Sequence, residues 1–65
     1  MLKNITKNYE NGDIYIGEIK NNLRNGKGIL CYDKNNVAKK DRYEGEWKND
    51  EREGKGIIYM IDGTM

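Results

Sequence analysis

The chain has 65 residues, of which 12 are Lys or Arg and 11 are Asp or Glu, giving a net charge of +1 at pH 7. Such balanced charge argues against a protein whose main task is to bind nucleic acid through its phosphates. A chain of this length forms one domain at most, and its core is modest. Because it also contains no Phe and no Pro, we expect a partner to help bury its apolar surface.

Cysteine content and hydropathy predict the cellular setting. Cys31 is the single cysteine and cannot form an internal disulfide, and no signal-like apolar run follows Met1. Both features favour a reducing, cytoplasmic environment. No apolar stretch approaches the ~18 residues that a transmembrane helix needs. Contact with a membrane or the cytoskeleton is therefore expected to be peripheral.

One segment occurs twice in the chain, at an offset of 28 residues. Self-similarity at a fixed offset is typical of repeat architectures, so the repeat has to be interpreted before any single residue. The pairs that recur are Tyr15 and Tyr43, Gly17 and Gly45, Glu18 and Glu46, Lys20 and Lys48, Arg24 and Arg52, Gly26 and Gly54, Lys27 and Lys55, Gly28 and Gly56, and Ile29 and Ile57.

The elements predicted in chain order are all strands. Asn11 and Gly12 form a strong turn signal, which predicts a hairpin between residues 5–9 and 14–20. A polar loop at 21–26 then leads to an apolar strand at 28–32, and residues 33–41 form a longer connection. Residues 42–48 alternate charged with aromatic or glycine, and 54–61 are β-branched and apolar, so both are strands. The predicted fold is all-β: an antiparallel meander of β-hairpins with about five strands and no long helix.

The period of two divides the apolar residues between two faces of this sheet. A single-layer sheet cannot bury both faces, and its outer strands expose unpaired backbone groups. We therefore expect a homodimer formed by sheet stacking or edge pairing, or else a fragment of a longer array. One face carries Tyr9, Tyr15, Gly17, Ile19, Leu30, Tyr32, Tyr43, Gly45, Trp47, Ile58 and Met60, and the other carries Ile14, Ile16, Ile29, Cys31, Ile57, Tyr59 and Ile61.

The pattern Tyr-x-Gly-x-aromatic, a polar segment, Gly-x-Gly, a short apolar run and Asp-Gly resembles the MORN repeat (membrane occupation and recognition nexus). The resemblance implies one domain, residues 1–65, in which 9–12 end a partial repeat, 14–41 form a repeat with an extended connection, and 42–65 form a second repeat. Asn22 and Asp50 stand where the family usually has Gly, and Ile19 where it has an aromatic residue. The spacing is also longer than usual, which places the extra residues in 33–41.

No catalytic residue, metal site or cofactor is predicted. The chain has no His, which removes the commonest general base and metal ligand. The paired glycines lack the third glycine of a dinucleotide-binding loop, so we expect them to be structural. These structural glycines are Gly17, Gly26, Gly28, Gly45, Gly54 and Gly56.

Two interpretations of the aromatic residues remain open. Tyr15, Tyr32, Tyr43 and Trp47 either pack within the repeats or receive an apolar or helical segment of a partner, since aromatic residues are favoured anchors at interfaces. The leading hypothesis is a non-catalytic protein-interaction and self-association module that serves as a scaffold or as part of a longer one. An accessory domain of an enzyme is a further alternative.

The family resemblance also implies phospholipid head groups as a ligand, so the alternative is a peripheral phosphoinositide-binding or phospholipid-binding module. The cations that would bind an anionic membrane surface are Lys27, Lys39, Lys40, Arg42 and Lys55. Polybasic binding usually takes a cluster of about four to eight cations. Acidic residues such as Asp33, Asp41 and Glu44 stand among these cations, which favours an ordinary solvated surface.

Overall fold

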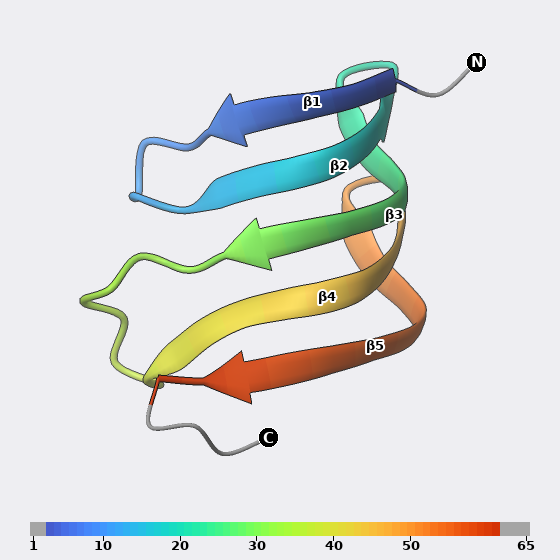
Figure 1. Ribbon diagram of the computed structural model, residues 1–65. Helices are drawn as coiled ribbons and strands as arrows, with labels where there is room; N and C mark the ends of the chain where they lie inside the picture. The colour runs from blue at the N-terminus through green and yellow to red at the C-terminus, as the bar shows by residue number, and fades with distance from the viewer. Residues whose placement is uncertain (1–2, 62–65) are drawn as a thin grey trace.

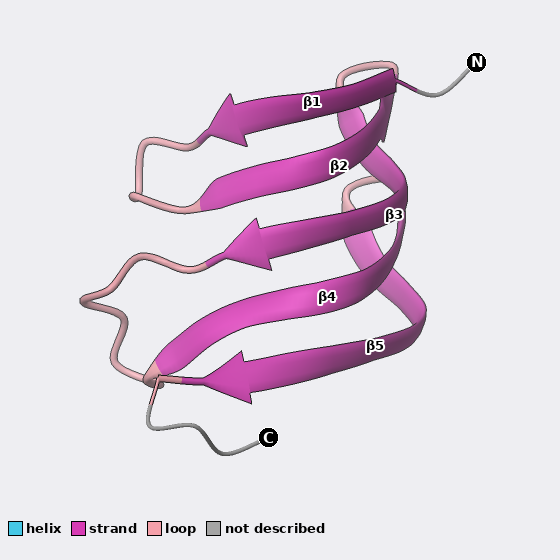
Figure 2. Ribbon diagram, in the orientation of Figure 1, coloured by secondary structure: helices cyan, strands magenta, loops and turns pink. Residues whose placement is uncertain are grey.

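The computed structural model describes residues 3–61, which form one open antiparallel sheet. Its strands are β1 (Lys3–Asn8), β2 (Ile14–Lys20), β3 (Leu23–Cys31), β4 (Lys40–Lys48) and β5 (Glu51–Met60). They lie side by side in chain order, and the connections alternate between the two ends of the sheet (Figure 1). Residues 3–61 contain no helix (Figure 2). The predicted five-stranded meander is confirmed.

The β2–β3 and β4–β5 turns each place two successive residues in the left-handed region. Asn21 and Asn22 have φ values of 52° and 64°, and Asn49 and Asp50 have 49° and 72°. A tight hairpin turn of this kind needs positive φ at both central residues, which Asn and Asp tolerate better than most other side chains. Asn22 and Asp50 can therefore take the place of the glycine that the family resemblance led us to expect.

The polar loop predicted for residues 21–26 is wrong, because β3 begins at Leu23 and β5 at Glu51. Both strands remain paired through their polar halves by means of bulges, which shift the register beside Gly17 and Gly45. Gly26 and Gly54 supply the positive φ values in the two bulged segments, 98° and 65°. A β-bulge of this type lets a strand continue past extra residues, so polarity alone did not mark a loop here.

The other two connections lie at the opposite end of the sheet (Figure 1). In the β1–β2 hairpin, the Tyr9 amide donates to the Asp13 carbonyl at 2.9 Å and Gly12 has φ 99°, which confirms the hairpin predicted from Asn11 and Gly12. The longer connection joins β3 to β4. There the Asn36 side chain accepts a hydrogen bond from the Lys40 amide at 2.8 Å and donates to the Lys40 carbonyl at 2.7 Å.

The core lies on the face predicted to carry the aromatic residues, which we call the aromatic face. Tyr15, Leu30, Tyr43 and Trp47 are buried there, with exposed fractions of 0 to 6%. The Trp47 ring meets both tyrosine rings edge to face, with centroid distances of 5.6 Å to Tyr15 and 5.2 Å to Tyr43. Partly buried Tyr9, Tyr32 and Ile58 pack around this cluster.

The opposite face, which we call the isoleucine face, stays largely open. Ile14, Ile16 and Ile57 remain 37%, 47% and 49% exposed. As expected for a single-layer sheet, one face is covered by its own side chains and the other is not.

A row of glycines crosses four neighbouring strands at one register. Gly17 on β2 pairs with Gly28 on β3, which pairs with Gly45 on β4, which pairs with Gly56 on β5. A Cβ atom on Gly28 would collide with the ring of Tyr15, and one on Gly56 would collide with the ring of Tyr43. The glycines therefore provide the space in which the two tyrosine rings lie against the backbone.

We predict that Gly28→Ala lowers the free energy of unfolding by about 2 to 3 kcal/mol and that Gly56→Ala lowers it by about 1 kcal/mol. Gly28 lies on an inner strand beneath Tyr15, whose hydroxyl donates to the Glu18 carbonyl at 2.6 Å and cannot move aside easily. Gly56 lies on the edge strand beneath Tyr43, whose equivalent contact is 3.4 Å long. Urea denaturation of the two variants measures the difference, and equal costs would contradict this explanation.

Candidate binding site

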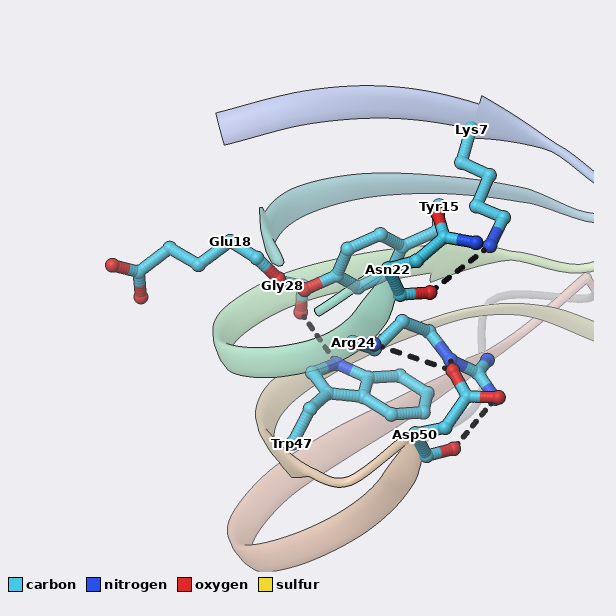
Figure 3. A network of polar contacts seen from close by, with 8 residues as sticks. All are labelled: Lys7, Tyr15, Glu18, Asn22, Arg24, Gly28, Trp47 and Asp50. Carbon is cyan, nitrogen blue, oxygen red and sulfur yellow. Dashed lines mark hydrogen bonds and ion pairs between the residues drawn. The ribbon is translucent and has the colours of Figure 1, made fainter. Parts of the chain in front are cut away.

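Two consecutive repeats are joined by contacts between Arg24 on β3 and Asp50 in the β4–β5 turn (Figure 3). The Arg24 Nε donates to Asp50 Oδ1 at 2.7 Å, and its Nη2 donates to the Asp50 carbonyl at 2.7 Å. In return, the Asp50 amide donates to the Arg24 carbonyl at 2.9 Å. Charge-assisted bonds with two fixed directions both hold and orient their partner, so these contacts set the position of the second repeat on the first.

Trp47 on β4 also joins the second repeat to the first. Its indole Nε1 donates to the Gly28 carbonyl at 3.3 Å, and the guanidinium carbon of Arg24 lies 4.3 Å from the centroid of its ring (Figure 3). A cation over an indole face contributes about 0.5 to 2 kcal/mol. We call the set formed by Tyr15, Arg24 and the Gly28 carbonyl the first socket; it receives Trp47 and Asp50 from the next repeat.

Protonation states in the first socket follow from burial and from Arg24. Burial raises the pKa of the Asp50 carboxyl, but the hydrogen bonds and the positive charge of Arg24 outweigh that effect, so the pKa lies below its ordinary value. Burial and the Glu18 carboxylate raise the pKa of the Tyr15 hydroxyl. Around neutral pH, Asp50 is therefore ionised and Tyr15 remains a hydrogen-bond donor.

A second set of the same groups occurs 28 residues later, formed by Tyr43, Arg52 and the Gly56 carbonyl. We call it the second socket. Residues 51–57 of β5 are exposed, and within residues 3–61 no strand pairs with the outer edge of β5. The guanidinium carbon of Arg52 lies 5.4 Å from the centroid of Tyr43. The second socket is therefore complete in its residues but holds no indole or carboxylate from the described part of the chain.

The four aromatic residues proposed for partner binding lie together on the aromatic face. Tyr15, Tyr43 and Trp47 are buried in contact with one another, and Tyr32 is partly buried at the margin of the cluster. Beside Tyr32 and Trp47 the face is hollowed by a cavity of about 390 Å³. A direct role of the four in binding remains a proposal, since three of them already fill the core. The lining is completed by Arg24, Leu30, Lys40, Asp50, Glu51 and Arg52.

The cations proposed for lipid binding do not gather in one patch. Lys27 lies at the register position of Glu46, six residues along β4 from Lys40, which is about 20 Å at 3.3 Å per residue. Lys39 lies in the β3–β4 connection, and Lys55 lines the isoleucine face together with Lys27. Arg42 donates to Asp41 at 2.7 Å and to Glu44 at 2.6 Å, so its charge is already paired.

The MORN repeat profile matches residues 15–37 and 43–65, which is more than half of the chain. The chain belongs to the MORN repeat family. No curated protein matches it. The residues between the two matches, 38–42, fall where the β3–β4 connection enters β4, so the long spacing between these MORN repeats arises at that point. MORN repeats occur in scaffold proteins and in lipid-binding proteins and are generally not catalytic.

The first socket shows what the interpretation of the sequence missed. The recurrence of Arg24 at Arg52 was visible in the sequence, but recurrence alone did not indicate a contact between the two repeats. The role of Arg24 between the repeats depends on Asp50, which is 26 residues away in the sequence. Among the residues that the structure describes, no three His, Cys, Asp or Glu side chains are grouped as a metal site, and no helix is long and apolar enough to cross a bilayer.

We predict that the free energy of unfolding of the Asp50→Asn variant falls less steeply than that of the parent as the pH is lowered into the acid range. Because the pKa of Asp50 is lowered in the folded state, its contribution is present above the unfolded value of about 3.9 and is lost as pH falls through the lower folded value. We expect the parent to lose about 0.5 to 1 kcal/mol more than the variant between about pH 5 and pH 2, a range reduced for the partial exposure of Asp50. Urea denaturation across this range measures the difference.

The control for that experiment is Asp41→Asn, which removes the same charge from the exposed ion pair with Arg42. This control should retain the acid slope of the parent. If the free energy of unfolding of Asp50→Asn fell with pH as steeply as that of the parent, Arg24 would not stabilise the Asp50 carboxylate.

Proposed function

We propose that this MORN protein is a non-catalytic module that binds another protein chain and associates with itself, in the manner of a scaffold component. The second socket is the observation that carries the proposal. It repeats, residue for residue, a set of groups that inside this chain already binds a hairpin. The unpaired Cys31 supports a cytoplasmic setting as part of the proposal.

Extension of the sheet at β5 is the binding mode that these groups favour. An exposed edge strand offers a row of unpaired N–H and C=O groups, and an added strand obtains affinity from them and specificity from its side chains. An incoming strand aligned on β5 as β4 is aligned on β3 would bring an aromatic donor to the Gly56 carbonyl. The residue three positions later would then reach Arg52, as Asp50 reaches Arg24.

The chemistry of the expected partner follows from this geometry. It is a β-hairpin that carries Trp, or another aromatic residue with a polar tip, followed three residues later by Asp in the turn. The aromatic residue would lie between the Tyr43 ring and the Arg52 guanidinium. The Asp carboxylate would accept a hydrogen bond from the Arg52 Nε and its backbone carbonyl would accept one from Nη2, as Asp50 does with Arg24. The residues of the socket would thus select both an apolar ring and a negative charge.

We predict that the protein binds a hairpin peptide made of residues 40–61 of its own sequence, closed by a disulfide between added terminal cysteines. The ends of this segment already lie together, since Lys40 pairs with Met60. Binding is measured by fluorescence anisotropy of the labelled peptide. Arg52→Ala in the protein should raise Kd at least about tenfold, because it removes a charge-assisted hydrogen-bond pair.

Two matched variants define the specificity of that binding. Lys34→Ala removes a cation from the β3–β4 connection, away from β5, and should leave Kd unchanged. Asp50→Ala in the peptide should also weaken binding, but less than Arg52→Ala does in the protein, because the backbone carbonyl that accepts from Nη2 remains. If Arg52→Ala bound the peptide as tightly as the parent, the second socket would not be a binding site.

Binding to anionic head groups is the alternative that a lipid experiment separates from this proposal. Sedimentation with phosphatidylserine vesicles at low salt should recover no more protein than sedimentation with phosphatidylcholine vesicles, because the cations are scattered and partly paired. Head-group binding would appear as recovery that falls steeply as salt rises. Such recovery, lost in a combined Lys27→Ala/Lys55→Ala variant, would favour the phospholipid function.

A further inference from the structure

The isoleucine face contains a trough with a volume of about 620 Å³ that no described side chain fills. Gly17, Gly28 and Gly45 are among the residues that line it. Beside these glycines runs an apolar row in register across four strands, Ile16 on β2, Ile29 on β3, Glu44 on β4 and Ile57 on β5. Glu44 interrupts this row but accepts a hydrogen bond from Arg42 at 2.6 Å, so its charge already has a partner.

A row of charges of alternating sign flanks the apolar row on the other side of the glycines. Its members are Glu18 on β2, Lys27 on β3, Glu46 on β4 and Lys55 on β5. The bulges beside Gly17 and Gly45 interrupt the register of this row, so that Glu46 is in register with Glu53 and Lys55 lies between Glu53 and Gly56, which pairs with Gly45. Lys27 is in register with Glu46, and the Glu18 carboxylate accepts a hydrogen bond from the Lys27 amide at 2.6 Å. Figure 3 shows Glu18 extending away from the rings of Tyr15 and Trp47.

None of these four charges is paired with an opposite charge within residues 3–61, although Glu18 accepts the hydrogen bond from the Lys27 amide. The ion pairs found in residues 3–61 are those of Arg24 with Asp50 and of Arg42 with Asp41 and Glu44. The alternating row thus takes part in no ion pair within the described chain. Three of its members, Lys27, Glu46 and Lys55, are also exposed.

The order of signs is complementary to itself. Taken from β2 to β5 the row has the signs minus, plus, minus, plus, and in the reverse order every sign is exchanged. A two-fold axis parallel to the strands and between β3 and β4 reverses the strand order of a facing copy. It therefore lays β2 over the partner's β5, and β3 over the partner's β4. An axis across the strands would instead lay each strand over its own copy and bring like charges together.

We propose that two copies of this chain stack isoleucine face to isoleucine face about that axis. Glu18 then meets the partner's Lys55, and Lys27 meets the partner's Glu46. Ile16 packs against the partner's Ile57 within the joined troughs. This inference rests on the self-association in the proposed function and assigns it a surface separate from the second socket.

The size of the face is sufficient for such a dimer. The molecule measures 36 × 26 × 15 Å along its principal axes, and the isoleucine face is one of its two broad sides. A stable interface buries about 800 Å² per partner, which a face of these dimensions can supply. Two sheets packed this way resemble the aligned sheets of a β-sandwich, whose inner side chains interdigitate.

The test uses charge reversal and mixing, with mass measured by light scattering over a range of concentrations. We expect the parent to reach twice its monomer mass of 7.6 kDa. Lys27→Glu and Glu46→Lys should each raise the Kd of the homodimer at least about tenfold, because each places two like-charge pairs in the interface. An equimolar mixture of the two variants should dimerise as tightly as the parent, because only the heterodimer restores both opposite-charge pairs.

The control is Lys34→Glu, which makes the same change in net charge in the β3–β4 connection and should leave the Kd of the homodimer unchanged. A parent dimer that neither charge reversal weakens would overturn the proposed surface while leaving self-association intact. A parent that stays monomeric at every concentration would overturn both, and peptide binding at the second socket would still stand or fall by its own measurement.

A disulfide test keeps the proposal falsifiable if a charge reversal fails to fold. Ile16→Cys and Ile57→Cys are combined in a Cys31→Ser background. Within one chain these positions lie three strands apart, about 14 Å at the usual strand spacing, which a disulfide cannot span. Under mild oxidation we expect a covalent dimer on a non-reducing gel, and none from a matched Val37→Cys/Ile57→Cys variant. Failure of the first pair to cross-link would overturn the proposed stacking.

Discussion

The close packing of tyrosine rings on glycine is the interaction on which the rest of this structure depends. Tyr15 lies over Gly28 and Tyr43 over Gly56. Each ring lies against backbone from which a Cβ atom on the glycine would displace it. Because both rings are thereby fixed, Trp47 can meet each of them edge to face and still reach the Gly28 carbonyl. Within residues 3–61 four apolar side chains are buried, and this arrangement brings them together as the core.

The same repetition that builds the core also builds the candidate site. Each repeat binds the next through an arginine, a tyrosine and a backbone carbonyl, and this socket is occupied once within the described chain. Its second copy is the interaction surface that we propose, because the groups that stabilise the fold recur there and no hairpin of residues 3–61 fills them. Under this proposal, fold and binding would use one set of contacts, and they would differ in whether the partner hairpin belongs to the same chain.

Strand number, topology and the sets of residues that share a face could be predicted from the sequence, because alternation with a period of two fixes which side chains lie together. Which of the two faces forms the core was not predicted. The residues at which β3 and β5 begin could not be predicted from the sequence. Residues 21–26 are polar, and polarity predicts a loop, but Asn21 and Asn22 close the turn and Gly26 supports a bulge. The first socket was also missed, since the pairing of Arg24 with Asp50 depends on the register between strands, which composition does not report.

The two proposed surfaces differ in symmetry, and together they determine what kind of assembly can form. Stacking through the isoleucine face is isologous and closes at two copies, whereas pairing at the β5 edge is heterologous and does not close. The two-fold axis reverses the strand order, so the two β5 edges of a dimer lie on opposite sides. Each dimer would then offer two identical sockets, and a partner with two suitable hairpins would gain effective concentration from binding both.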